Sequence, residues 1–509
     1  MTAARPALPG QQPALPGNQP ALPGQQPDAA GQQPALAGRQ RAPRRKPGWL
    51  LAAGVAAFAV AITGYVIFAV THPEVRWINP VDLSVYQDGG LVVRHLTPLY
   101  RPQLKAPLYH WPGITLQFTY PPFSALVFTV LTLAPLAVLA IIFVGVNIAA
   151  LLGTIWVILG TLGYRRVTVR LGATLLLAAA LFWTEPVQRT LYLGQIELVL
   201  MLLICWDQCQ PDRRWWKGAG IGIAAGLKLV PLIFIPYLLL TRRYRQAAVA
   251  AGVFAATVAF GFVALPGDSH QWWLGHLFYK GSRTGFVGWE GNQSVLGVLT
   301  RLAGSTAAGQ PLWHGAALVI AVAGLVAAAV LDRGGQRLAG LLTCALTALL
   351  ISPISWDHHW VWIVPGVVLF AHYAVRALSA AARASWAGAA IAVTALFGAW
   401  PGSLWGEPAD LGAFSEGIIW APPNTDPFTY LVRGDRRRYV EYHWHGLQLL
   451  TGNLYILAGM ALFALALLAA LSRAGRGGPA VAGGRRHASA GMIKQQYSGT
   501  GAVAAPQAD

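Results

Sequence analysis

The chain has 509 residues, of which 55% are hydrophobic and 11% charged, and a formal net charge of +18. Soluble domains carry about 25% charged residues, so this composition excludes an ordinary soluble protein and indicates a polytopic membrane protein. The positive charge does not indicate a nucleic-acid partner. Lys and Arg cluster in short runs between apolar segments, which is the pattern that orients membrane proteins.

Residues 1–48 are expected to form a disordered cytoplasmic tail. A degenerate seven-residue repeat rich in Pro, Gly and Gln occupies residues 6–40, and its prolines exclude a coiled coil. A basic run follows, formed by Arg41, Arg44, Arg45 and Lys46. The apolar segment from Trp49 to about Val70 is predicted to be an uncleaved membrane anchor, and its basic flank keeps the N-terminus cytoplasmic.

Residues 71–121 form a polar, aromatic-rich stretch that is too long for a simple turn. The predicted orientation places this stretch on the extracytoplasmic side, with Asp82 near its start. A loop that combines charged and aromatic residues at a membrane interface is typical of binding or chemistry. By itself Asp82 could be a solvated loop acid, and Asp88 is a rival for any catalytic role.

Apolar segments continue almost to the end of the chain, and we expect ten to thirteen transmembrane helices in one domain, residues 49–472. After the forty apolar residues from Phe123 to Leu162, which could hold two spans, further segments lie near 171–183, 191–206, 218–240, 246–265, 313–331, 338–354, 360–375, 385–400 and 451–472. The basic runs between them place the C-terminal tail, residues 473–509, in the cytoplasm. The earlier runs fit this rule only with short or re-entrant segments around Glu185 to Gln195 and around Lys228.

Polar groups in or beside membrane segments are costly and therefore often functional. The densest such group is Ser352–Trp360, which contains Asp357, His358 and His359. Two adjacent histidines lack the usual spacing of a metal-binding pair, so phosphate or hydroxyl recognition is favoured, with an interfacial aromatic belt as the alternative. Lys228 is a candidate ligand for a phosphate, although a lysine here could also extend its ammonium group to the interface.

Six short motifs occur along the chain in this order: Asp82-Leu83-Ser84-Val85-Tyr86, Thr119-Tyr120-Pro121-Pro122-Phe123, Gly194-Gln195, Gly226-Leu227-Lys228-Leu229-Val230-Pro231, Asn292-Gln293-Ser294 and Ser352-Pro353-Ile354-Ser355-Trp356-Asp357-His358-His359. Together they resemble the actinobacterial polyprenyl-phosphate-mannose-dependent α-(1→2)-mannosyltransferases, glycosyltransferase family 87. The similarity covers about residues 72–460. Glu197 departs from the family pattern, which has a neutral amide soon after Gly-Gln.

The resemblance implies an all-α polytopic membrane enzyme, with a GT-C-type helix bundle, extracytoplasmic loops and an active site at the extracytoplasmic face of the cell membrane. The implied donor is polyprenyl-phosphate-mannose. The implied acceptor is a mannosylated lipid or glycan of the phosphatidylinositol mannoside or lipomannan type, and inversion would give an α-linkage. Asp82 corresponds to the general base. The residues expected to bind substrate are Tyr86, Arg101, Lys228, Asn292, Gln293, Arg301, His358 and His359.

One carboxylate is enough for this reaction, because phosphate leaves without prior protonation and only the acceptor hydroxyl needs a base. Fixed cations would stabilise the charge that develops on the phosphate, and Lys228, Arg301, Arg101 or a histidine could supply it. We therefore expect neither a metal ion nor a cofactor. The alternative function is a flippase or transporter of a lipid-linked sugar. Transporters often show internal repeats and polar groups at the membrane midplane, whereas this chain shows no repeat of its spans and its motifs gather at the predicted outer face.

Overall fold

The computed structural model describes residues 48–71, 77–100, 116–279, 283, 285–399, 416–425 and 439–476. Nearly all of the two expected tails, and also Arg101, lie outside the described residues. Within the described residues the elements are helices and two isolated β-bridges. The expectation of an all-α polytopic membrane protein is therefore confirmed.

The α-helices in chain order are α1 (Gly48–Thr71), α2 (Val81–Arg94), α3 (Pro122–Phe128), α4 (Leu136–Thr161), α5 (Val167–Phe182), α6 (Glu185–Leu193), α7 (Glu197–Cys209), α8 (Ala219–Leu227), α9 (Phe234–Leu240), α10 (Tyr244–Ala264), α11 (Pro266–Ser269), α12 (Val295–Ala303), α13 (Thr306–Arg333), α14 (Arg337–Ile351), α15 (Ile363–Arg376), α16 (Ala380–Leu396), α17 (Leu447–Thr451) and α18 (Leu454–Arg476). Short 3₁₀ segments are η1 (Thr129–Leu133), η2 (Val230–Ile233), η4 (Leu277–Tyr279), η6 (Asp357–Trp362), η8 (Ile418–Trp420) and η11 (Val440–His443), and η3 (His270–Leu274) is π-helical.

Among the described residues, five helices are long and apolar enough to cross a membrane: α1, α4, α10, α13 and α18. The bent pair α6 and α7 is a sixth candidate, and five further segments are apolar helices of 10–17 residues. The expected ten to thirteen spans are therefore reached only if the shorter helices also cross. The forty apolar residues after Phe123 form one long helix, α4, preceded by the short α3 and η1. The segment therefore contains one full-length span, although its length would allow two.

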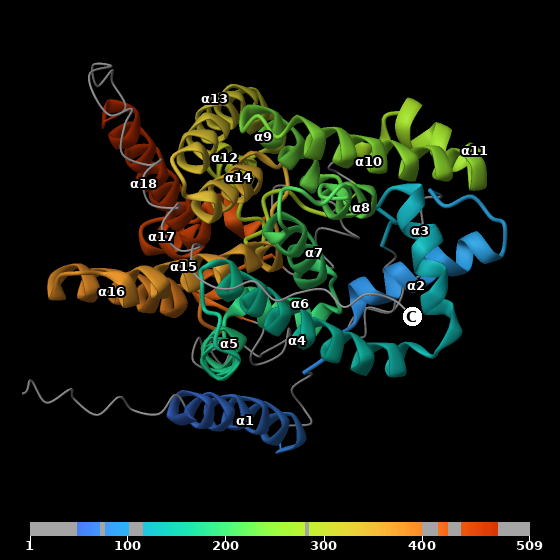
Figure 1. The fold of residues 1–509 in the computed structure, drawn as a ribbon. Coiled ribbons are helices and arrows are strands. Elements are labelled where there is room, and N and C mark those ends of the chain that lie inside the picture. Colours follow the sequence, from blue (N-terminus) through green and yellow to red (C-terminus); the bar gives the residue numbers. More distant parts are fainter. Residues whose placement is uncertain are drawn as a thin grey trace, which may run out of the picture. The chain divides into compact units, whose positions relative to one another are not determined.

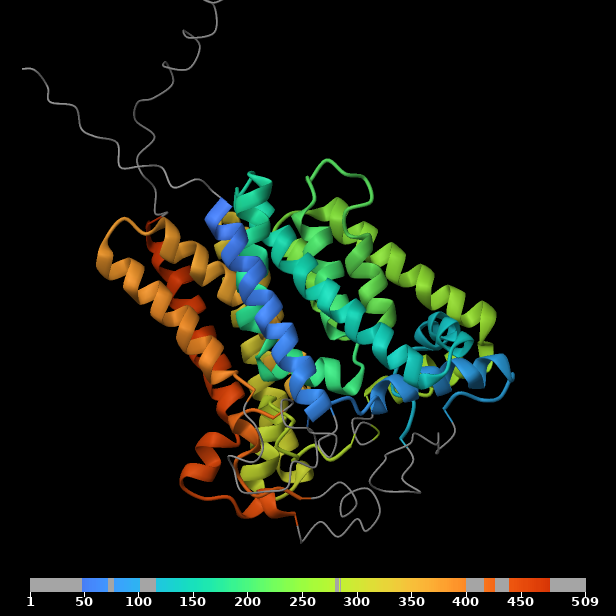
Figure 2. The ribbon, with the colours of Figure 1, turned by 90° about the horizontal axis from the view of Figure 1, so that it is seen from below.

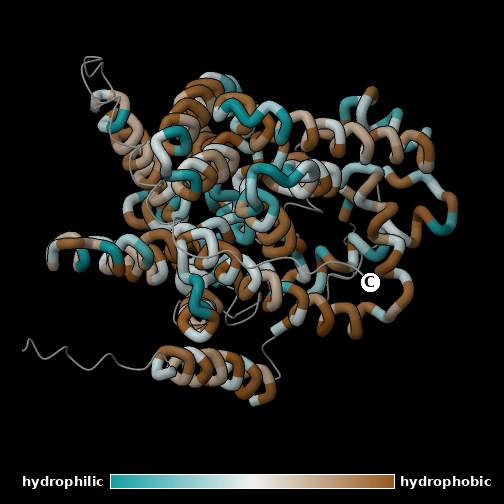
Figure 3. Tube along the Cα trace, in the orientation of Figure 1, coloured by the Kyte–Doolittle hydropathy of each residue, from teal (hydrophilic) through white to brown (hydrophobic). Residues whose placement is uncertain are grey.

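The long helices pack against one another through small residues. Helix α1 lies along α5, α4 along α7, α8 along α10 and α13 along α14 (Figures 1 and 2). At the α1–α5 contact, a Cβ atom on Gly172 would lie 2.6 Å from the backbone of Leu50, so only glycine permits this approach. Such contacts are typical of helices that associate in lipid. Figure 3 shows hydrophobic residues along α1, α4 and α10.

Two breaks interrupt the apolar segments, at the places where the charge pattern predicts short or re-entrant pieces. The chain bends by 117° between helices α6 and α7. Gly194, at this bend, has a φ of +69°, in the region that favours glycine. Helix α8 ends at Lys228, whose backbone is extended, and Pro231 lies in the following η2. The breaks bring Gln195 and Lys228 out of regular helix, and both take part in the site described below.

The polar stretch after α1 contains an ordered helix, α2, that is fixed to the segment just before α4. The Gln87 side chain donates hydrogen bonds to the carbonyl oxygens of Leu131 and Ala134, at 3.0 and 2.8 Å. A Cβ atom on Gly90 would lie 2.5 Å from the carbonyl oxygen of Phe128, so α2 packs tightly against α3 and η1. Figure 2 shows α2 lying across one end of α4.

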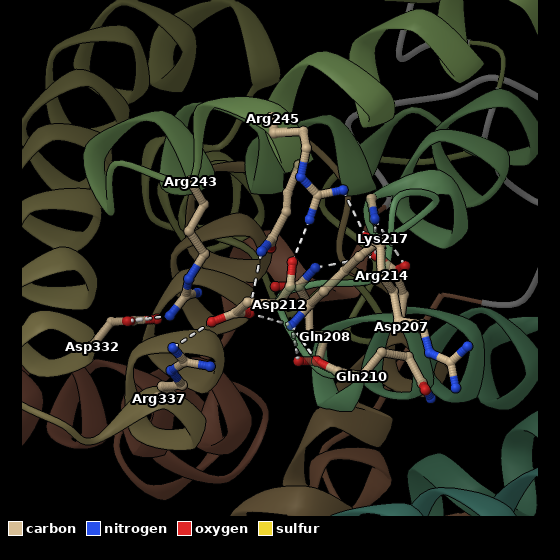
Figure 4. Close-up of polar contacts among 12 residues, drawn as sticks. Asp207, Gln208, Gln210, Asp212, Arg214, Lys217, Arg243, Arg245, Asp332 and Arg337 are labelled. Carbon is tan, nitrogen blue, oxygen red and sulfur yellow. Dashed lines mark hydrogen bonds and ion pairs between the residues drawn. The ribbon is translucent and has the colours of Figure 1, made fainter.

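A cluster of ion pairs joins three connections between helices, those of α7–α8, α9–α10 and α13–α14. Asp212 pairs with Lys217 at 2.9 Å and with Arg337 at 2.6 Å, and Arg243 pairs with Asp332 at 2.5 Å (Figure 4). Asp212 follows α7, Lys217 precedes α8 and Arg337 begins α14. They therefore lie at the ends of those helices that are remote from Glu197, Lys228 and the Ser352–Trp360 segment.

Candidate active site

Asp82 lies in the first turn of α2 and is partly buried. The Asn79 N–H group donates a hydrogen bond to the carbonyl oxygen of Tyr192 at 2.9 Å, which holds the start of α2 beside α6. One turn further along α2, Tyr86 is fully buried. The acid is therefore held in place by packing, and it is not a freely solvated loop residue.

Gln195 lies between Tyr86 and Asp82. The Tyr86 hydroxyl donates to Gln195 Oε1 at 2.5 Å and lies 3.1 Å from the hydroxyl of Tyr120. The Gln195 side chain also lies close to the Asp82 carboxyl and acts to lower its pKa. The motif around Asp82 and the Gly194-Gln195 motif thus form one unit.

Lys228 lies beside Asp82 and is held by two further residues. Its ammonium group forms an ion pair with the Glu197 carboxylate and lies 2.9 Å from His359 Nε2. An ammonium group can only donate, so His359 Nε2 must accept and the ring carries its proton on Nδ1. The ammonium group has three N–H donors. Among the described residues it has these two hydrogen-bond partners, which leaves one donor for a ligand.

His358 is oriented by Asp357, which in turn contacts Arg189. His358 Nδ1 lies 3.0 Å from Asp357 Oδ1, and Arg189 Nε lies 3.3 Å from Asp357 Oδ2. All three side chains are at most 5% exposed. His358 Nε2 has no hydrogen-bond partner among the described residues, and His358 interacts electrostatically with Asp82. The free ring nitrogen is thus available to a substrate near the acid.

Behind this pair lies a second buried acid, Glu185. Its two oxygens accept hydrogen bonds from the Trp420 indole at 3.2 Å and from the Tyr455 hydroxyl at 3.1 Å. Its carboxyl group also lies beside that of Asp357. The contacts with Trp420 and Tyr455 thus fix Glu185 next to the acid that orients His358.

The electrostatic environment of Asp82 combines opposing effects. Burial raises the pKa of the Asp82 carboxyl above its ordinary value, whereas His358, the polar side chain of Gln195 and the charges of Lys228 and Arg189 act to lower it. Asp88, the rival acid, lies six residues further along α2, so its side chain points about 120° away round the helix. Burial raises the pKa of Asp88 to about 6. Of these two acids, Asp82 is the one that interacts with His358 and Lys228.

Three residues of the centre could together hold a metal ion. Glu197, His358 and His359 offer ligand atoms that all lie within 4.8 Å of one another. The Lys228 ammonium group already contacts two of the three and supplies a positive charge there. The expectation that no metal is needed stays a prediction, and turnover that survives chelation of divalent cations would support it.

Other predicted substrate-binding residues do not join this centre. Asn292 and Gln293 are fully buried and hydrogen-bonded to backbone groups, including the N–H groups of Ser355 and Ile456. The Arg301 guanidinium donates to the carbonyl oxygens of Trp289 and Asn292 and to the side chain of Asn453. These residues shape the loops that carry η6. Arg101 lies outside the described residues.

Arg189 has a central position that the sequence pattern did not reveal. Besides its contact with Asp357, its guanidinium lies 4.5 Å from the ring centroid of Trp420. The available signal was a single arginine inside the short helix α6, whose one other charged residue is Glu185. Glu197, which departs from the family pattern, also proves to be part of the centre through its ion pair with Lys228.

Comparison with known proteins identifies relatives of this chain. The sequence model of glycosyltransferase family 87 matches residues 118–353. The polyprenol-phosphate-mannose-dependent alpha-(1-2)-phosphatidylinositol pentamannoside mannosyltransferase of Mycobacterium tuberculosis (strain CDC 1551 / Oshkosh) is 38% identical, over 56% of this chain and 65% of the relative. The protein of the same name from Mycolicibacterium smegmatis is 35% identical, over 60% of this chain and 73% of the relative.

A third relative, the polyprenol-phosphate-mannose-dependent alpha-(1-2)-phosphatidylinositol mannoside mannosyltransferase of Mycobacterium tuberculosis (strain ATCC 25618 / H37Rv), is 31% identical, over 64% of this chain and 76% of the relative. No solved structure matches the chain significantly. The family match includes Gln195, Lys228 and the residues that shape the η6 loop, and the relatives extend the similarity over most of their own length. The chain is a membrane glycosyltransferase that belongs to glycosyltransferase family 87.

Proposed function

We propose that this enzyme transfers mannose from polyprenyl-phosphate-mannose to a mannosylated phosphatidylinositol acceptor, with Asp82 as the general base. The observation that carries the proposal is the convergence of Asp82, Lys228 and the His358–His359 pair, which come from three distant parts of the chain, in one buried polar centre. The names of the relatives support the choice of donor and acceptor.

In the proposed reaction the acceptor hydroxyl oxygen attacks the anomeric carbon of the mannosyl group. The bond between that carbon and the phosphate oxygen breaks, and its electron pair stays on the polyprenyl phosphate. The hydroxyl proton passes to the Asp82 carboxylate, which is the general-base step. A single displacement of this kind inverts the anomeric carbon and requires no second carboxylate.

Lys228 is assigned to the donor phosphate. Its remaining N–H donor can bond a phosphate oxygen, and a preorganised cation stabilises the charge that grows on a leaving group. His358 is assigned to the substrates through its unpartnered Nε2 atom, because Asp357 fixes the other ring nitrogen. His359 contributes by holding the lysine. Tyr86 acts through Gln195, which it holds beside the Asp82 carboxyl.

The proposed location of the centre is the extracytoplasmic face. The cluster around Asp212 and the neighbouring exposed Arg213 and Arg214 concentrate basic residues at the opposite ends of α7, α8 and α14. Positively charged connections tend to stay in the cytoplasm. If the end with the Asp212 cluster is cytoplasmic, Asp82 and Lys228 face the extracytoplasmic side. The proposal then also places both chain termini in the cytoplasm.

The test is transfer by the purified full-length protein in lipid nanodiscs. Polyprenyl-phosphate-mannose and its arabinofuranose counterpart are offered separately, each with a phosphatidylinositol mannoside acceptor. We expect an elongated glycolipid with the mannose donor. Product with the arabinofuranose donor alone would contradict the choice of sugar. Movement of the lipid-linked sugar across proteoliposomes without any glycosylated product would favour the transporter instead, an alternative that membership of a glycosyltransferase family does not support.

A further inference from the structure

Two polar side chains, Asn147 and Thr154, lie inside the long apolar helix α4, away from its ends, and both are fully buried. A polar group buried in a membrane span is costly unless it forms hydrogen bonds. Thr154 Oγ1 has no hydrogen-bond partner among the described residues, whereas the Asn147 amide donates two hydrogen bonds. Of the two residues, Asn147 is therefore the one that can fix another part of the chain.

Asn147 connects α4 to the bend between α6 and α7. Its Nδ2 atom donates to the carbonyl oxygen of Phe143, one turn earlier on α4, and to the carbonyl oxygen of Gln195, each at 3.0 Å. Both partners are acceptors, so the NH2 group of the amide must face them. One donor of Asn147 is thus used within its own helix, and the other reaches across to the bend.

Gln195 needs such a partner because it lies outside regular helix. It follows Gly194, which ends α6 in a left-handed conformation, and it comes before α7, which begins at Glu197. A carbonyl group at a helix break lacks its helical partner, and in lipid a neighbouring helix must supply another. Asn147 supplies this partner and thereby fixes the backbone of Gln195.

We propose that Asn147 is a positioning residue for the general base and acts on it through Gln195. The inference rests on the proposed function, in which Asp82 is that base. Asn147 binds the backbone of Gln195, and Tyr86 binds its side-chain Oε1 atom. The Gln195 side chain lies close to the Asp82 carboxyl. Gln195 is thus held at both ends, and loss of the contact with Asn147 would let its side chain move away from the acid.

The first test is a double-mutant cycle with the full-length protein in nanodiscs. Asn147→Leu is similar in size and removes the amide donors. We expect kcat to fall about tenfold, because a small displacement of catalytic groups lowers the rate, while KM for both substrates changes little. In a Gln195→Met enzyme, Asn147→Leu should cause no further loss of kcat. Thr154→Val is the matched control on the same helix, and it should keep the wild-type kcat.

The pH profile distinguishes positioning from support of the fold. The ionisable groups that interact with Asp82 are Tyr86, Tyr120, Arg189, Lys228 and His358. The Gln195 side chain acts to lower the pKa of Asp82, so displacing it should raise that pKa. The acidic limb of kcat/KM should therefore move to higher pH in Asn147→Leu. A purely structural role of Asn147 would lower the Tm and leave the limb where it is.

The possible outcomes separate this inference from the proposed function. Additive losses of kcat in the cycle, an unmoved acidic limb, or an equal loss in Thr154→Val would overturn the assignment of Asn147. A folded Asp82→Asn enzyme with near-normal turnover would instead overturn the proposed function, and the cycle would still measure whether Asn147 and Gln195 are coupled. If Asn147→Leu is too unstable to purify, Asn147→Gln, which keeps an amide donor at a shifted position, enters the same cycle with the same expected coupling.

Discussion

The Nζ atom of Lys228 lies 2.9 Å from Nε2 of His359, so the histidine ring accepts a hydrogen bond from the lysine. The Glu197 carboxylate contacts the same ammonium group. A flexible lysine side chain is thereby fixed at the end of a broken helix. A lysine held in this way is part of an organised site, unlike a lysine whose ammonium group only extends toward the membrane surface.

Replacing Lys228 with Met keeps the length of the side chain and removes its charge. Because a single preorganised donor at a developing negative charge contributes about 10²–10³-fold in rate, we expect kcat/KM for the lipid donor to fall by about 10²-fold. The measurement is steady-state kinetics in nanodiscs. Lys217→Met is the matched control, since Lys217 is also buried but lies in the remote ion-pair cluster. An equal loss of kcat/KM in both variants would contradict the assignment of Lys228.

The Glu197→Gln variant tests whether the carboxylate competes with the donor phosphate for Lys228. Glutamine can still accept a hydrogen bond from the ammonium group, but it removes a negative charge close to the incoming phosphate. We expect KM for the donor to fall severalfold, because one removed like-charge repulsion at an effective dielectric constant of about 20 amounts to ~1 kcal/mol or more. A higher KM in this variant would show that the charge on Glu197 is needed to position Lys228.

The pH profile of kcat/KM should report the ionisation of Asp82. A general base must be deprotonated, so activity is lost as the pH falls through its pKa. Burial raises that pKa above the ordinary value of 3.8, and the loss should therefore begin at a higher pH than for an exposed aspartate. The control is Asp88→Asn, because the pKa of Asp88 is raised to about 6. If the acidic limb disappears in Asp88→Asn, Asp88 is the titrating group and the assignment of Asp82 is wrong.

Arg301 was expected to bind phosphate, but its donors already bond to backbone carbonyl groups and Asn453. Arg301→Met should therefore act on stability. It leaves several buried acceptors unpaired at about 1–3 kcal/mol each, so we expect a clear drop in the Tm of the purified protein. KM for the donor should be unchanged in the folded fraction. A normal Tm combined with a large rise in KM would instead support phosphate binding by Arg301.

The sequence singled out the candidate site residues in two ways. Lys228 and the His358–His359 pair stand out because polar groups in or beside apolar segments are costly without a function. Asp82 lies in a polar stretch, and its assignment came from the resemblance to glycosyltransferase family 87. The sequence also predicted the helix breaks near Gln195 and Lys228 from the charge pattern. It could not separate these residues from Asn292, Gln293 and Arg301, which are equally polar. Their partners are backbone groups, including that of Gly452, and the Asn453 side chain, and no residue pattern reveals these pairings.

Arg189 and Glu197 show the second limit of sequence reasoning. An arginine near a membrane segment usually marks orientation, and nothing in the pattern shows that Arg189 meets Asp357, which lies 168 positions further along the chain. The importance of Glu197 follows only from the fold, because α7 and the end of α8 must pack together before its carboxylate can reach Lys228. Pairings of this kind depend on tertiary structure.

The most direct test of the account compares Asp82→Asn with Asp88→Asn, two matched substitutions on the same helix. Both proteins are purified, shown to be folded by their Tm, and incubated with polyprenyl-phosphate-mannose and a phosphatidylinositol mannoside. If Asp82 is the general base, its variant should lose at least ~10²-fold in kcat, and Asp88→Asn should retain activity. A folded Asp82→Asn enzyme with near-normal turnover would contradict the central claim.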